Sequence, residues 1–463
     1  MKTFLNLIPA VSRDTTLSLS LAAFSFIIYL SNFRTIGSGD TVPASLLPII
    51  LLTEGSIYFD SYGQHYEKNG NPAYFFHHTR GRTVSSYPLA TGFLATPIYT
   101  IPVLGWKIIH KPTIEEWISF ARIMEKAAAA ALTSISIIVF FYTCRSLNCQ
   151  RVTAIWLSAA FAFGSEAWST SSQGLWMHSP GISFMLLSTF LALRHERASS
   201  LRSALLLGLC CGVAVAVRLN NILFVGPLLC WILWKRHRHF IPILISTAIV
   251  VIPLVAYNRS CYGTFTGAYG VDFTTPFLLG LEGSLFSPAR GLFIYFPLTI
   301  FAITGFVNAF RKPHTAHRTI YLVFFLFIGA SIASVSKWAM WWGGFSYGPR
   351  LLAEVQPFLL LSSVPTCKTL FEQRQPKLGM LAFFLLFAWS TSTQVLGAYV
   401  PSDWNWTPKS VDEAPGRVWD WGDNPMSRSV HVIEIFLASH LPGANPSPSQ
   451  LRREIPHPSE QPS

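Results

Sequence analysis

Residues 33–44 read FRTIGSGDTVPA and begin where the first apolar run, Leu17–Phe33, ends. That run is close to the length of one membrane-spanning helix. Asp40 is the acidic residue of the stretch, and the turn Gly37-Ser38-Gly39 lets the backbone bring its carboxylate close to a ligand. A charge at the mouth of a membrane helix is costly unless it is paired or used. We therefore expect Asp40 to be the acid–base group of a membrane enzyme, or alternatively the N-cap of a helix that follows.

The composition of the whole chain is that of a multi-pass membrane protein. Apolar residues make up 51% of the 463 residues and charged residues only 12%, about half of the ~25% found in soluble domains. The 15 Trp fit aromatic belts at the two membrane–water interfaces. Basic cytoplasmic loops explain the formal charge of +12, and no nucleic-acid-binding motif accompanies it. Membrane lipids are therefore expected partners, and nucleic acid is excluded.

Apolar runs that approach the ~20 residues of a spanning helix recur along the chain. We predict about eleven such helices, at residues 15–33, 117–143, 152–166, 175–193, 203–219, 221–234, 240–257, 291–310, 319–336, 351–366 and 378–399. Lys and Arg gather in alternate loops, which places the N-terminus in the cytoplasm. The run 89–109 contains Pro97 and Pro102, so we expect an interrupted helix in the interface that does not cross.

This pattern predicts an all-α membrane protein, a polytopic helical bundle with one long outer loop at 34–116 that carries interfacial helices. The membrane domain covers residues 1–400, and an outer tail covers 401–463. Pro442–Ser463 is rich in Pro and Ser and is expected to be disordered. The polar and aromatic loops fall on the outer side, which predicts an active cavity open to that face. The lack of a large outer domain favours a bacterial inner (plasma) membrane.

Three arginines in the outer loops are candidate phosphate ligands, because a planar guanidinium matches phosphate oxygens. Arg80 and Arg82 lie in the first outer loop, where the alternative is a solvated or headgroup-binding pair on a hairpin. Arg350 ends the stretch WAMWWGGFSYGPR, residues 338–350, which combines stacking surface, backbone donors and a fixed positive charge. The alternative for Arg350 is an ion pair with Glu354, four residues further along a helix.

Other residues of the outer side are candidates for substrate contact. Glu166 and His178 lie near membrane depth, where ionisable groups are usually functional or paired. Arg218 faces either a phosphate or a carboxylate, and Trp342 and Tyr347 offer aromatic surface to a sugar. The chain lacks a P-loop, G-x-S-x-G, H-E-x-x-H and Asp-x-Asp, and its seven Cys lack zinc spacing. We therefore expect neither a metal nor a bound cofactor.

The order of these features resembles the GT-C superfamily of integral-membrane glycosyltransferases, and within it bacterial relatives of protein O-mannosyltransferases and lipid A aminoarabinose transferases. The resemblance covers about residues 15–400. It rests on Ser38-Gly39-Asp40-Thr41, Ser86-Tyr87-Pro88, Gly174-Leu175-Trp176-Met177-His178 and Ser346-Tyr347-Gly348-Pro349-Arg350. It implies inverting, metal-independent transfer of a hexosyl or pentosyl group from a polyprenyl-phosphate-linked donor. The acceptor is a hydroxyl of a glycan, lipid or protein.

The resemblance also implies roles for individual residues. Asp40 would be the general base, and the three arginines would hold the donor phosphate. Relatives often have paired acids in the first loop, but Thr41 follows Asp40 here, which leaves Asp60 or Glu166 as the second acid. Tyr87 stands before a Pro where aminoarabinose transferases have a phosphate-contacting Lys, so we count it among the substrate-binding residues.

Two other classes of function stay open. A transporter or flippase of lipid-linked glycans predicts polar residues in mid-membrane and two related halves, whereas the charges here cluster at outer helix ends. A non-catalytic GT-C scaffold would bind lipid or a partner without transferring a sugar.

Overall fold

The structure is a computed structural model, and it describes residues 12–268, 272–311, 317–373, 377–400 and 402–440. Within these ranges, helices and loops form the whole molecule except for one two-stranded hairpin. This confirms the prediction of an all-α membrane protein, with the hairpin as a small exception inside the first outer loop.

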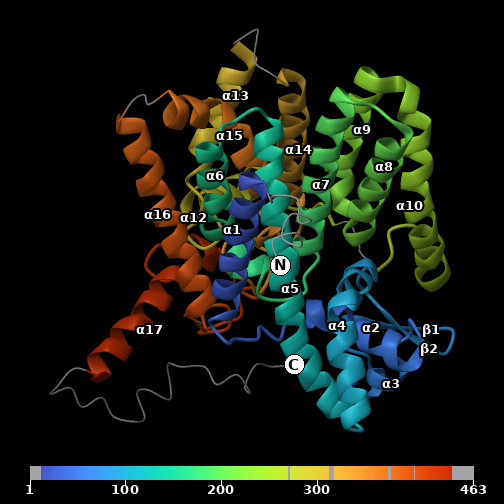
Figure 1. The fold of residues 1–463 in the computed structure, drawn as a ribbon. Coiled ribbons are helices and arrows are strands. Elements are labelled where there is room, and N and C mark those ends of the chain that lie inside the picture. Colours follow the sequence, from blue (N-terminus) through green and yellow to red (C-terminus); the bar gives the residue numbers. More distant parts are fainter. Residues whose placement is uncertain (1–11, 269–271, 312–316, 374–376, 401, 441–463) are drawn as a thin grey trace, which may run out of the picture.

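A bundle of long helices forms the body of the molecule (Figure 1). Its helices are α1 (Arg13–Leu30), α5 (Ile114–Ser146), α6 (Arg151–Gly164), α7 (His178–Arg197), α8 (Leu201–Val217), α9 (Ile222–Arg236), α10 (Phe240–Tyr262), α13 (Thr299–Arg311), α14 (Arg318–Lys337), α15 (Val355–Glu372) and α16 (Lys377–Tyr399). Each predicted span overlaps one of them. The span predicted at 291–310 is broken, because Pro297 separates a short turn, α12 (Leu292–Tyr295), from α13.

The predicted number of crossings is not confirmed. Five stretches of the described residues are long and apolar enough to cross a membrane: Ala90–Ile109, Ile114–Ser146, Leu219–Tyr262, Arg318–Lys337 and Lys377–Tyr399. Several other bundle helices are short. α6 has 14 residues, or about 21 Å at 1.5 Å per residue, against a hydrocarbon core of about 30 Å.

The predicted interruption at 89–109 is wrong. α4 (Ala90–Ile109) is one continuous helix that includes Pro97 and Pro102. Proline is tolerated inside helices in apolar surroundings. The hydroxyls of Thr96 and Thr100 donate to the carbonyls of Gly92 and Thr96, which are not the carbonyls of Phe93 and Ile98 that the two prolines leave without a backbone donor. That α4 stays outside the membrane remains a prediction.

Residues 39–109 form a compact unit, here called the first-loop lobe. It contains α2 (Val42–Glu54), α3 (Asp60–Gly63), the hairpin β1 (Phe76–Thr79) and β2 (Arg82–Ser85), and α4. Figure 1 shows it below the bundle at the right, against the first half of α5. Its core joins Leu47 of α2, Tyr99 of α4 and Trp117 of α5.

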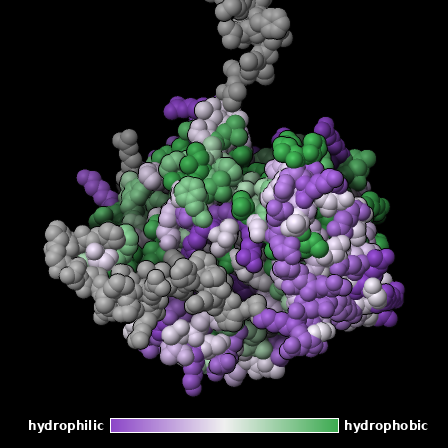
Figure 2. All heavy atoms as spheres, turned by 90° about the horizontal axis from the view of Figure 1, so that it is seen from below, coloured by the Kyte–Doolittle hydropathy of each residue, from purple (hydrophilic) through white to green (hydrophobic). Residues whose placement is uncertain are grey.

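The lobe and the basic loops lie at opposite ends of the molecule. The end of α13 and the start of α14, where Arg311 and Arg318 stand, are at the top of Figure 1. Seen from below, the half of the surface that carries the first-loop lobe is largely hydrophilic (Figure 2). This arrangement fits the predicted topology, although the orientation itself remains a prediction.

Residues 402–428, here called the C-terminal segment, fold back onto the loop that follows α14. Trp404 is fully buried and packs with Trp341 and Ala289 in a small apolar cluster. α17 (Pro425–His440) then projects from the body at the lower left of Figure 1. The stretch predicted to be disordered, residues 442–463, lies outside the described residues.

Candidate active site

Asp40 lies in a short 3-10 turn, Gly39–Thr41, between α1 and α2, with its side chain 22% exposed. Its Oδ1 accepts hydrogen bonds from the phenol of Tyr74 at 2.9 Å and that of Tyr87 at 2.7 Å. Its Oδ2 accepts from Nη1 of Arg350 at 2.9 Å. The alternative role as an N-cap is wrong, since Thr41 caps α2. Asp40 is therefore held as an ionised acceptor at the meeting point of three elements.

The hairpin explains why the two phenols converge. Phe76 pairs with Ser85 at its open end, and the ladder continues as Ser86 N–H donates to the carbonyl of Phe75. Tyr74 and Tyr87 therefore leave the two strands side by side. A Cβ on Gly39 would lie 2.5 Å from the Tyr74 hydroxyl, so only glycine allows this approach.

The environment keeps the Asp40 carboxyl ionised. Burial alone raises its pKa, but the guanidinium of Arg350 and the hydrogen bonds from Arg350, Tyr87 and Tyr74 lower it by more, so the net shift is downward. A carboxylate of this kind is present throughout the neutral range. It can accept a proton only as the attacking hydroxyl becomes acidic in the transition state.

Arg350 reaches Asp40 from the loop that follows α14. Its Nη2 donates to the carbonyl of Gly343 at 3.0 Å, and its guanidinium lies 5.6 Å from the ring centre of Trp176. Gly343 has a φ of +76°, which favours glycine. The Nε of Arg350 is buried without a hydrogen-bond partner among the described residues. The alternative ion pair with Glu354 is wrong, because Arg350 binds Asp40 instead.

Glu354 binds His178 and Arg218 instead. Its Oε1 contacts Nδ1 of His178 at 2.9 Å and also accepts from Nη1 of Arg218. The histidine and the carboxylate are both almost fully buried. Of the two partners expected for Arg218, a phosphate or a carboxylate, the structure shows the carboxylate of Glu354.

Glu166 is fully buried at the end of α6, where a π-helical turn, Ala167–Ser171, begins. Ser169 and Thr170 donate to its Oε2, and its Oε1 lies next to Gly348. Tyr347 is close by, with its hydroxyl donating to the carbonyl of Thr393 at 2.8 Å. The structure therefore brings Glu166 behind the Arg350 loop and gives it no contact with Asp40.

None of the remaining candidates forms a hydrogen bond with Asp40, whose partners among the described residues are Tyr74, Tyr87 and Arg350. Arg82 forms an exposed ion pair with Asp60 at 2.8 Å, and Asp60 also accepts from the backbone of Thr83 at 2.6 Å. Arg80 donates to Ser260 at 3.3 Å. Both arginines are at the turn of the hairpin, about 13 Å along the strands from the end that carries the two phenols. Trp342 donates from Nε1 to Asp412 at 2.8 Å.

The sequence reasoning missed several residues near the site. Glu125 and Lys126 of α5 are both buried. The Oε2 of Glu125 accepts from the backbone of Leu175 at 3.4 Å, and Lys126 donates to Asn32 at 2.9 Å. Two adjacent charges inside an apolar run are rare and could have been noticed. Tyr74 carried no such signal, because an exposed aromatic residue in a loop is common.

Residues 112–266 match the family model described as dolichyl-phosphate-mannose-protein mannosyltransferase. This confirms the resemblance to GT-C glycosyltransferases. The match covers about a third of the chain. It begins after Asp40 and ends before Arg350, so both residues lie outside it. No curated protein matches the chain.

The match and the apolar helices together indicate an integral membrane glycosyltransferase that uses a polyprenyl-phosphate-linked sugar. Among the described residues, no group of three His, Cys, Asp or Glu side chains is arranged to hold a metal ion. That transfer is metal-independent remains a prediction.

Proposed function

We propose that this GT-C glycosyltransferase transfers its sugar to an acceptor hydroxyl at Asp40, which acts as the general base. The observation that carries the proposal is the carboxylate of Asp40, held by Arg350 and two phenols. A buried ion pair of this kind adds little to stability. An ionised carboxylate in this position, beside a fixed guanidinium and an exposed phenol, favours a chemical role.

The reaction balances with the residues at hand. Tyr74 is 67% exposed, so an acceptor hydroxyl can replace its phenol on Oδ1 of Asp40. The hydroxyl oxygen forms a bond to the anomeric carbon while its proton passes to Asp40. The bond from the anomeric carbon to the phosphate oxygen breaks, and polyprenyl phosphate leaves with the electron pair. A guanidinium stabilises the charge that develops on the phosphate, and attack opposite to the leaving group gives inversion.

Among the three candidate arginines, Arg350 is the best supported as a phosphate ligand. It is the one in contact with Asp40, and its Nε–H is free to donate. Arg82 lies at the turn of the hairpin and does not contact Asp40, and its ion pair with Asp60 weakens the case for Asp60 as a second acid. Glu166 remains the other proposed second acid, although a buried position behind the Arg350 loop suits a supporting role better.

The sugar and acceptor are proposed by class. The matched family model favours mannose as the first sugar to test, with a protein or glycan hydroxyl as acceptor. We propose that transfer occurs on the outer face of a bacterial inner membrane. This rests on the predicted topology, in which the first-loop lobe lies opposite the basic loops.

The test is transfer of radiolabelled mannose from polyprenyl-phosphate-mannose in membranes that contain the full chain. Asp40→Asn should lose transfer at normal protein level. Asp60→Asn is the matched control, because Asp60 is a carboxylate of the same lobe that also pairs with an arginine, and it should transfer nearly as the wild type does. Equal loss in both variants would remove Asp40 from the role of base. Movement of the labelled lipid between leaflets without transfer would favour a transporter.

A further inference from the structure

A second buried arginine lies next to the site. Arg290 follows α11 (Phe277–Phe286) and is only 2% exposed. It donates from Nε to the carbonyl of Trp342 at 2.7 Å and from Nη1 to that of Ala289 at 3.0 Å. Its Nη2 donates to the carbonyl of Gly344 at 3.1 Å and to Oδ1 of Asn405 at 2.9 Å. Arg290 is thus held at four N–H positions, which fixes where its charge lies.

None of these partners is charged. Within the described part of the chain, no carboxylate oxygen lies within 4.0 Å of the Arg290 guanidinium. Burial lowers the pKa of Arg290, and the more distant carboxylates of Glu166 and Asp412 only partly offset this effect. A buried cation without a direct ion pair is costly, so an anion that entered the cleft would stabilise it, and one N–H of Nη1 is left over for that anion.

Arg290 and Arg350 line one small cleft together with Trp341, Trp342 and Gly348. One short loop, residues 342–344, fixes both guanidiniums. Arg290 donates to the carbonyls of Trp342 and Gly344, and Arg350 donates to the carbonyl of Gly343 between them. The buried Nε–H of Arg350 lacks a partner. A cleft with two fixed guanidiniums and an unused donor suits a phosphate.

The charges of the two arginines are not equivalent. Arg350 is already balanced by Asp40 at 2.9 Å, so this pair is neutral as a whole. A phosphodiester that enters the cleft brings one negative charge, and it needs a cation beyond this pair. Arg290 is a cation of the same cleft that forms no direct ion pair among the described residues.

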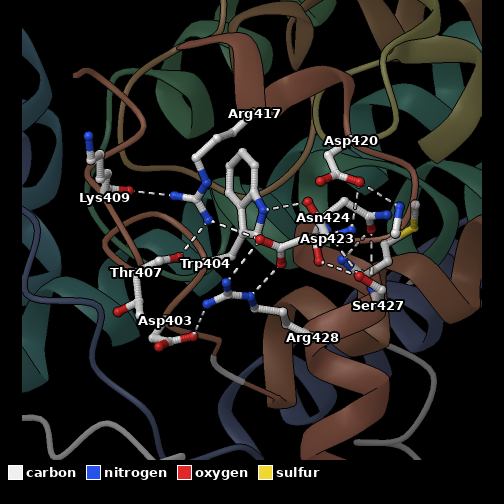
Figure 3. Close-up of polar contacts among 12 residues, drawn as sticks. Asp403, Trp404, Thr407, Lys409, Arg417, Asp420, Asp423, Asn424, Ser427 and Arg428 are labelled. Atoms are coloured by element: carbon white, nitrogen blue, oxygen red, sulfur yellow. Dashed lines mark hydrogen bonds and ion pairs between the residues drawn. The ribbon is translucent and has the colours of Figure 1, made fainter. Parts of the chain in front are cut away.

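The C-terminal segment holds Arg290 in place. The guanidinium of Arg290 lies 5.2 Å from the ring centre of Trp404, and that of Arg417 lies 4.8 Å from it. Trp404 donates from Nε1 to the carbonyl of Asp423 at 2.8 Å. Arg428 links the two ends of the C-terminal segment, because it forms ion pairs with both Asp403 and Asp423. Figure 3 shows these side chains around the indole of Trp404.

We propose that Arg290 supplies the positive charge for the donor phosphate in the cleft it shares with Arg350, and that Trp404 and Asn405 position it there. The proposal rests on the proposed function, and it makes the C-terminal segment part of the donor site. Arg350 then has a divided role, since it orients Asp40 through Nη1 and offers Nε–H to the phosphate.

The experiment is lipid binding by the purified full chain, with polyprenyl phosphate and the uncharged polyprenol as the two probes. Arg290→Gln should raise the Kd for polyprenyl phosphate about 10- to 100-fold, as expected for loss of a charged partner, and leave polyprenol binding unchanged. Asn405→Ala should weaken phosphate binding in the same selective way, by a smaller factor. Arg290→Lys keeps the positive charge and should retain most of the phosphate binding. This variant provides a second measurement at the same position if Arg290→Gln fails to fold.

Arg259→Gln is the matched control, because Arg259 also packs on an aromatic ring, that of Phe265, but lies outside the cleft and the C-terminal segment. It should leave both Kd values within about threefold of the wild type. Unchanged phosphate binding in Arg290→Gln, equal weakening of both lipids, or equal effects of Arg259→Gln and Arg290→Gln would overturn the proposal. Binding needs no turnover, so selective loss in Arg290→Gln supports the site even if no sugar transfer is found. Asp40→Asn should bind polyprenyl phosphate while transferring nothing.

Discussion

Asp40→Asn should abolish sugar transfer, and adding Arg350→Gln should recover stability without recovering activity. The single change keeps the shape of the side chain and removes the charge that Arg350 pairs with at 2.9 Å. The double change removes both charges together. Because Arg350 is also the proposed phosphate ligand, the double variant is expected to be slow in any case, and only recovery of its rate would show that Asp40 has a purely structural role.

The two effects have different magnitudes. The Arg350 side chain is 14% exposed and that of Asp40 22%. An unpaired guanidinium in this position costs about 1–3 kcal/mol, less than the ~3–5 kcal/mol for a pair with no access to water. Loss of a general base slows transfer about 100- to 10,000-fold, which is about 3–5 kcal/mol in the barrier. The double variant should regain most of the stability and keep the slow rate.

The assay combines thermal unfolding in detergent with initial rates of transfer from polyprenyl-phosphate-mannose, at matched protein level. The refuting result is a double variant whose rate returns to within about tenfold of the wild type. That outcome would mean that Asp40 serves only to neutralise Arg350. Retention of more than about a tenth of the rate in the single variant would refute the general-base role directly.

The pH dependence follows from the lowered pKa of Asp40. Burial raises this pKa, and Arg350, Tyr87 and Tyr74 together lower it by more. The stability contributed by the carboxylate is therefore present above its ordinary pKa of about 3.9, and it is lost as the pH falls through the lower folded value. The rate kcat/KM should show no acid limb from Asp40 between pH 5 and 8. Tyr87→Phe removes one stabilising hydrogen bond and should move the acid limb to higher pH.

Further changes give distinct outcomes. Gly39→Ala places a Cβ 2.5 Å from the Tyr74 hydroxyl, so it should displace this phenol from Asp40 and lower the unfolding free energy by about 1–3 kcal/mol, read by thermal unfolding and by transfer. Glu354→Gln leaves a buried arginine and histidine without their carboxylate and should cost about 3–5 kcal/mol; a melting temperature within a degree of the wild type would contradict this. Arg82→Gln breaks an exposed ion pair and should change stability by less than about 1 kcal/mol. Transfer by that variant should stay within about threefold, whereas a large loss would return Arg82 to the phosphate site.

The parts of the site that the sequence predicted are those with an unusual local composition. Asp40 stands beside a glycine turn, and Arg350 ends a stretch dense in Trp and Gly, so each could be recognised alone. Their contact joins positions 310 residues apart, and nothing local in either stretch encodes it. Ridges of apolar side chains decide which helices pack together, and many pairings satisfy the same pattern.

Local sequence alone did not decide two other features. Pro97 and Pro102 predicted a broken helix, because proline lacks the backbone N–H in any sequence, but α4 continues through both. Phosphate binding by Arg80 and Arg82 remains a prediction, and the tight turn between β1 and β2 places both arginines at the end of the hairpin opposite Tyr74 and Tyr87. The sequence next to these residues does not encode where the fold puts them.

The C-terminal segment has a consequence for how the protein is made. Arg290 is held in part by Asn405, which stands after the last helix of the bundle. On the proposed role of Arg290, a nascent chain lacks a complete donor site until α16 has been inserted and residue 405 has reached the side of the first-loop lobe. Lipid-linked sugar that meets an incomplete chain finds Asp40 and its arginine but no ordered cation at Arg290. Biosynthesis itself would thus delay the onset of catalysis until the whole bundle is assembled.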